Sequence, residues 1–121
     1  MSLHLELGAH IQSAFSDALA GPPQQMQDAL IVPLRNGIVL QIRYAAPDAY
    51  SLRWTRDGHE AGIDTAPLHP DLATFPNHLH DTSGRAYPDP LTRTDATPED
   101  NVSALIRALL DDPALGAPPA A

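Results

Sequence analysis

The sequence of 121 residues contains no cysteine and no lysine, and it has no long apolar run. Without cysteine the chain can form no disulfide, no thiolate nucleophile and no cysteine-based zinc site. No stretch approaches the roughly eighteen consecutive apolar residues of a membrane-spanning helix, so we expect no membrane partner. The N-terminus lacks a basic region followed by an apolar segment, and we therefore expect no secretory signal and a cytoplasmic location.

The formal net charge of −8 argues against nucleic acid as a partner, because non-specific affinity for nucleic acid comes from neutralising phosphates. The acids, however, are concentrated at the two ends of the chain. Residues 1–34 hold three acids and no arginine, and residues 94–121 hold five acids and one arginine, whereas residues 35–93 hold six arginines against seven acids. RNA therefore stays open as a partner of the nearly neutral middle segment.

The length suits one domain with a single modest core, and two segments have the apolar spacing of helices. The first runs from about Leu3 to Ala20 and is ended by Gly21 and two prolines. The second begins at Thr97-Pro98, an N-cap threonine followed by proline. Its apolar stripe consists of Val102, Leu105, Ile106, Leu109 and Leu110. We expect residues 1–113 to form the domain and residues 114–121 to form a flexible tail.

Between these helices the sequence predicts antiparallel strands joined by tight turns. Asn36-Gly37 is typical of a type I′ hairpin, and Pro33 before it predicts an edge strand, because proline has no N–H for the ladder. Residues 50–54 alternate as a half-buried strand does, and Asp57-Gly58 predicts a second tight turn into residues 59–65. We expect an α+β fold: an N-terminal helix, a four- or five-stranded antiparallel meander with residues 77–81 as the fifth strand, and a C-terminal helix packed on the sheet.

Residues 64–80 hold half of the six histidines together with three prolines. Because proline restricts φ, this composition predicts a stiff, ordered loop. If residues 78–80 are extended, His78 and His80 point to the same face, since strand side chains alternate. Two imidazoles on one face, with His69 nearby in sequence, suit either a metal site or an acid/base pair.

The same segment carries a family pattern, Asp-x-Ala-Pro-x-His-Pro-x-Leu-x-Thr-Phe-Pro-x-His-x-His, from Asp64 to His80. It resembles the TumE family, small toxins of bacterial toxin-antitoxin pairs, and the likeness extends more loosely from about Ile38 to the C-terminal helix. This chain has Leu68 where many members have a further histidine, and Leu79 where many have a basic residue. The resemblance implies a bacterial toxin with an antitoxin protein as its partner.

Two kinds of chemistry fit these residues. His69, His78 and His80 could bind zinc or another divalent ion as a cofactor. The carboxylate of such a metal site would come from Asp64, Asp71 or Asp81. Alternatively, a metal-free endoribonuclease would use one histidine to take the proton of the 2′-hydroxyl and another to protonate the leaving oxygen. The residues for charge stabilisation and orientation in that case are Arg43, Arg53, Arg85 and Asp64.

A non-enzymatic function also remains open, that of a module whose acidic surface and proline-rich loop dock a protein partner. A homodimer stays open for either function. In such a module the histidine and proline loop would be structural. Imidazole N–H groups would bond backbone carbonyls, and Phe75 would fill the core.

Overall fold

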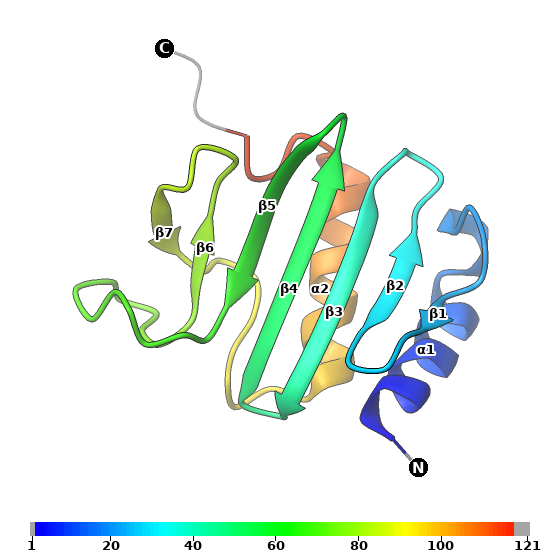
Figure 1. Ribbon diagram of the computed structural model, residues 1–121, viewed down its shortest axis with the longest axis horizontal. Coiled ribbons are helices and arrows are strands. Elements are labelled where there is room, and N and C mark those ends of the chain that lie inside the picture. The colour runs from blue at the N-terminus through cyan, green and yellow to red at the C-terminus, as the bar shows by residue number, and fades with distance from the viewer. Residues whose placement is uncertain (1, 118–121) are drawn as a thin grey trace.

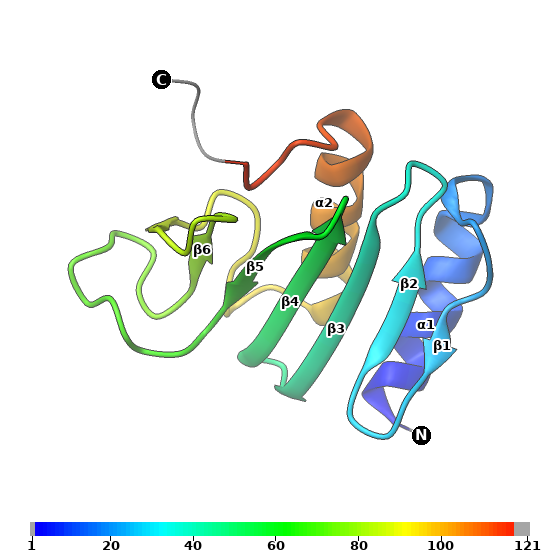
Figure 2. The same cartoon turned by 45° about the horizontal axis from the view of Figure 1, so that its top comes forward.

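The computed structural model describes residues 2–117 and contains an antiparallel sheet of seven strands in chain order. The strands are β1 (Gln24–Gln25), β2 (Leu30–Pro33), β3 (Val39–Ala46), β4 (Ala49–Arg56), β5 (His59–Asp64), β6 (His78–His80) and β7 (Ala86–Pro88). The helices are α1 (Leu3–Ala14), the short 3-10 helix η1 (Ser16–Ala18) and α2 (Pro98–Asp111). In Figures 1 and 2, α1 lies behind β1 and β2 and α2 behind β3 and β4, so the helices cover one face of the sheet and leave the other open.

The predicted meander is confirmed over β2 to β5, and β6 adds the predicted fifth strand. The predicted strand number is wrong, because β1 and β7 complete a sheet of seven. Gln24–Gln25 contains no apolar residue and Ala86–Pro88 ends in a proline, so neither segment carries the alternation that predicts a strand. Pro33 is also not on an edge strand, since β1 pairs with β2, although only at Leu30 and Ile31.

Both predicted tight turns are present, and they differ in type. Asp57 and Gly58 have φ of 52° and 80°, as a two-residue type I′ turn requires. At the first hairpin Gly37 has a φ of 91° and its N–H donates to the carbonyl of Leu34, while Asn36 has no positive φ. This connection is therefore a three-residue loop that ends in a bulge glycine, and the predicted type I′ geometry is wrong there.

The N-terminal helix is shorter than predicted, because α1 ends at Ala14 and not near Ala20. Phe15 leaves the helical conformation (φ −127°, ψ 25°), and Leu19 then pairs with Leu34 as a bridge to the sheet. The apolar spacing continued past the helix end because Leu19 is buried against the sheet instead of along a helix face.

Helix α2 confirms the second prediction, with the side chain of Thr97 accepting a hydrogen bond from the backbone N–H of Asp100. Four residues of the predicted stripe are fully buried, while Leu110 is partly exposed. They share one apolar core with side chains of α1 and of β2 to β6, among them Leu7, Ile11, Leu30, Val32, Leu40, Ile42, Leu52, Trp54, Ile63 and Leu79. Within residues 2–117, neither helix has the length and apolar character needed to cross a membrane.

Part of the predicted flexible tail lies against the sheet. The indole Nε1–H of Trp54 donates to the carbonyl of Leu115 at 3.0 Å, and the N–H of Thr82 donates to the carbonyl of Gly116 at 2.9 Å. Residues 118–121 of that tail lie outside the described residues.

Candidate functional site

The strand register brings five of the seven predicted catalytic residues onto the open face, the face of the sheet that carries no helix. Paired residues on neighbouring strands share a face and lie about 5 Å apart. One row of paired residues across β3, β4, β5 and β6 is Arg43, Ser51, Asp64 and His78. The next row is Gln41, Arg53, Gly62 and His80.

The carboxylate of Asp64 lies between the two histidines of β6. Its Oδ1 is 3.4 Å from Nε2 of His78, and its Oδ2 is 3.5 Å from Nε2 of His80. The backbone N–H of Ala66 also donates to Oδ1 at 3.0 Å, which fixes the carboxylate at the end of β5. Burial alone would raise the pKa of Asp64, but the hydrogen bonds from His80 and Ala66 and the charges of the two histidines outweigh it, so the pKa is lowered. The site therefore favours an ionised carboxylate.

Gly62 leaves the space above β5 that the His80 ring occupies. A Cβ at position 62 would lie 3.0 Å from Cε1 and Nε2 of His80, and 3.0 Å from the carbonyl oxygen of Leu52. The imidazole therefore lies across β5 above the glycine. Because Arg53 is the residue paired with Gly62 on β4, the ring leans toward the strand that carries this arginine.

The ring of His78 is a neighbour of both His69 and His80, and it is buried. His69, from the loop between β5 and β6, meets His78 edge-on at 4.8 Å between ring centroids, and His78 and His80 are 6.0 Å apart. The side chain of His78 is only 5% exposed, and its Nδ1 lies 3.4 Å from the carbonyl oxygen of Pro76. The side chain of His80 is 24% exposed. His80 and His69 are therefore the partly exposed rings, whereas His78 is enclosed.

The predicted arginines separate into two groups. Arg43 and Arg53 are exposed on the open face, where Arg53 lies 3.5 Å from Glu60 in an exposed ion pair. Arg85 instead stacks on the ring of Tyr87, which pairs with the core-facing Leu79. Arg85 therefore does not join the histidines.

A buried polar network that the sequence did not predict holds the loop in front of His78. The side-chain amide of Asn77 donates to Oδ2 of Asp89 at 2.8 Å and to the carbonyl of Thr92 at 3.0 Å. The other oxygen of Asp89 accepts from the N–H groups of Leu91 and Thr92. An aspartate between two prolines, in Pro88-Asp89-Pro90, is the only signal of this network in the sequence. The loop is thus ordered, as predicted.

The prediction that Phe75 fills the core is wrong, because Phe75 is 44% exposed. The hydrogen bonds from Asn77 to Asp89 and to Thr92 hold this end of the loop instead.

Within the described range, no group of three or more histidine, aspartate or glutamate side chains is arranged to hold a metal ion. The His78 ring lies next to the rings of both His69 and His80, and the Asp64 carboxylate lies between Nε2 of His78 and Nε2 of His80. Asp71 is exposed on the loop, and Asp81 accepts the N–H groups of Ser83 and Arg85 in the β6–β7 turn.

In a comparison with protein families, residues 9–112 match the family described as Toxin TumE. No curated protein and no solved structure matches the chain. The match spans most of the sequence, so the chain belongs to the TumE toxin family. Membership implies a toxin of a toxin-antitoxin system, with an antitoxin as its partner.

Proposed function

We propose that this member of the TumE toxin family is an endoribonuclease that cleaves RNA without a metal ion, by proton transfer at His80. The observation that carries the proposal is the Asp64 carboxylate, which lies 3.5 Å from Nε2 of the partly exposed His80. A carboxylate beside an imidazole orients the ring and stabilises the positive charge that the ring acquires when it takes a proton. With Asp64 at Nε2, the nitrogen Nδ1 of His80 is the atom that meets the substrate.

In this reaction the 2′-hydroxyl oxygen attacks the adjacent phosphorus, and the bond from phosphorus to the 5′ oxygen of the next nucleotide breaks. His80 takes the proton of the 2′-hydroxyl. His69, which is partly exposed and lies on the loop next to His78, gives a proton to the leaving 5′ oxygen. The products are a 2′,3′-cyclic phosphate and a 5′-hydroxyl. His78 is a positioning residue, because it is buried and contacts Asp64.

Arg53 stabilises the negative charge that builds up on the phosphate oxygens. Its side chain is 45% exposed, and it shares a row with His80, from which it is separated only by Gly62, a residue with no side chain. Arg43, on the same face in the neighbouring row, binds the phosphate of a flanking nucleotide. Together these two arginines contact only a few phosphates, which suits a short single-stranded RNA.

The test is to incubate the purified chain with a short single-stranded RNA and to identify the product ends by mass spectrometry. His80→Ala should slow cleavage by about 10²–10⁴-fold, the usual contribution of a general acid or base, and should leave the melting temperature nearly unchanged. Arg53→Ala should also slow cleavage, whereas its matched control Arg93→Ala should not, because Arg93 forms an exposed pair with Asp95 away from the open face. The proposal is wrong if the parent protein makes no cyclic phosphate or if His80→Ala cleaves at the parent rate.

One observation favours the second function, a protein-binding module with a structural histidine loop. His78 is buried and its Nδ1 lies near the carbonyl of Pro76, as expected of a ring that fixes the loop. In that case His78→Ala should lower the free energy of unfolding, and the parent protein should produce no cleaved RNA at any concentration.

A further inference from the structure

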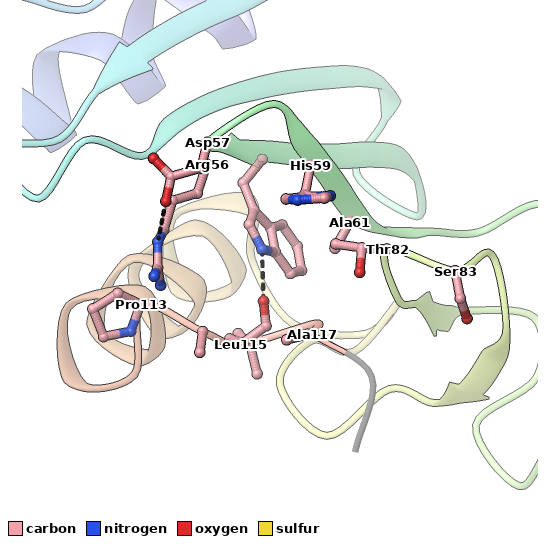
Figure 3. Close-up of a pocket in the computed structure, with 11 residues that line it drawn as sticks. Arg56, Asp57, His59, Ala61, Thr82, Ser83, Pro113, Leu115 and Ala117 are labelled. Atoms are coloured by element: carbon pink, nitrogen blue, oxygen red, sulfur yellow. Dashed lines mark hydrogen bonds and ion pairs between the residues drawn. The ribbon is translucent and has the colours of Figure 1, made fainter. Parts of the chain in front are cut away.

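A pocket of about 470 Å³ lies where the β4–β5 hairpin, the β6–β7 turn and the segment after α2 meet (Figure 3). We call it the C-terminal pocket. Trp54, Ala61 and Leu115 form its apolar wall, and Thr82 and Ser83 contribute hydroxyl groups. Trp54 and Ala61 are paired residues on the core side of the sheet, whereas the histidine site is on the open face. The C-terminal pocket is therefore separate from the candidate active site.

The segment after α2 is fixed in place, so the pocket exists before any partner binds. The carbonyl of Leu115 accepts from the indole N–H of Trp54, and the carbonyl of Gly116 accepts from the N–H of Thr82. Gly116 has a φ of 86°, and a Cβ there would lie 2.5 Å from Cβ of Ala61. Only glycine permits this close approach. A preformed pocket binds a side chain without a further ordering cost.

The edge of the C-terminal pocket carries an excess of negative charge. Asp111 and Asp112 are exposed at the C-terminal end of α2, directly before the pocket residue Pro113. The helix dipole adds negative potential at this end, and no basic residue lies in the last turn. On the other side, Asp57 is exposed and lies 3.5 Å from Arg56, so the single arginine of the pocket is already paired. A cationic partner fits this edge.

We infer that the C-terminal pocket is the docking site of the antitoxin, which inserts an apolar side chain flanked by a lysine or arginine. The apolar side chain lies against Trp54 and Ala61, and the cation lies at the end of α2 near Asp111. An antitoxin is the partner that family membership implies, and its docking here does not depend on whether the histidine site cleaves RNA. The acidic edge selects a basic segment over an acidic one by charge complementarity.

The probe is the purified cognate antitoxin, titrated into the full chain. Trp54 is the only tryptophan, so the single indole N–H signal in an NMR spectrum reports on this pocket alone. We expect that signal to shift as the antitoxin binds. Ala114→Phe, at an exposed position that lines the pocket, should weaken binding by tenfold or more, and Ala14→Phe on α1 is its matched control.

Asp111→Arg tests the charge, and it should weaken binding several-fold. Its matched control is Asp48→Arg in the β3–β4 turn, an exposed aspartate at the opposite end of the sheet, which should bind like the parent. Because Asp111 is exposed, this variant tests the inference even if Ala114→Phe does not fold. Antitoxin binding that leaves the indole signal unmoved and is insensitive to both pocket variants would overturn the inference. An indole signal that moves on dilution of the toxin alone would also overturn it, since the occupant would then be a second copy.

Discussion

Gly62→Ala gives a direct test of how His80 is held. The added Cβ would lie 3.0 Å from two ring atoms of His80 and 3.0 Å from the carbonyl oxygen of Leu52, closer than ordinary van der Waals contact. Overpacking of this kind lowers the free energy of unfolding by about 1–3 kcal/mol. Replacing glycine also restricts the unfolded chain, which stabilises by about 0.4–1 kcal/mol, so we expect a net loss of about 1–2 kcal/mol.

Gly62→Ala in the His80→Ala background separates the contact with the His80 ring from the contact with the Leu52 carbonyl, because only the second remains when the ring is absent. Urea unfolding of the parent, both single variants and the double variant gives the coupling energy between the two positions. We expect a coupling of about 1 kcal/mol, within the usual range for residues in contact. RNA cleavage by Gly62→Ala should fall by more than the loss of folded protein explains, since the ring is displaced. A loss that is equal in the two backgrounds would show that the ring does not lie over Gly62.

Three further predictions concern the ionisation of Asp64, the packing of α2 and the absence of a metal requirement. Because the pKa of Asp64 is lowered in the folded state, its contribution to stability is complete above the unfolded pKa of about 3.9 and is lost as the pH falls through the lower folded value. Between about pH 5 and pH 2 the parent should therefore lose more free energy of unfolding than Asp64→Asn, and equal losses in urea titrations would contradict this. Leu105→Ala and Ile106→Ala, both at fully buried positions, should each lower the free energy of unfolding by about 2–5 kcal/mol, and unchanged melting temperatures would mean that α2 is not packed on the sheet. Cleavage should survive a chelator, and activity that is lost with chelator and restored by zinc or manganese would rule out the metal-free reaction.

The parts of the fold that could be predicted are those with a local signal. Asp57-Gly58 predicts its turn because a type I′ turn needs positive φ at both positions, and Thr97-Pro98 predicts the start of α2 because threonine caps the first turn. β1 and β7 have no such signal, since their pairing depends on neighbours that tertiary packing brings close. At Leu19 the sequence instead predicted a helix that is absent. The helical spacing of apolar residues extends to Leu19, but this residue pairs with Leu34 and packs on the sheet.

For the candidate site, strand alternation predicted that His78 and His80 share a face, and the register confirms it. The partnership with Asp64 depends on how β6 aligns with β5 after the loop of residues 65–77, and loop composition does not determine that alignment. Gly62 could not have been identified, because its importance lies in the space above it and not in any chemistry of its own. The burial of His78 likewise depends on the tertiary contacts of Asn77 and Asp89.

Strand β5 links the two functional surfaces through consecutive residues. Ala61 faces the C-terminal pocket and meets Gly116, whereas Gly62 faces the opposite side and supports the ring of His80. The proposed antitoxin site and the proposed RNA site therefore lie on opposite faces of the same strand. If both proposals hold, the antitoxin and the RNA bind without contact between them, and inhibition of cleavage has to act through β5.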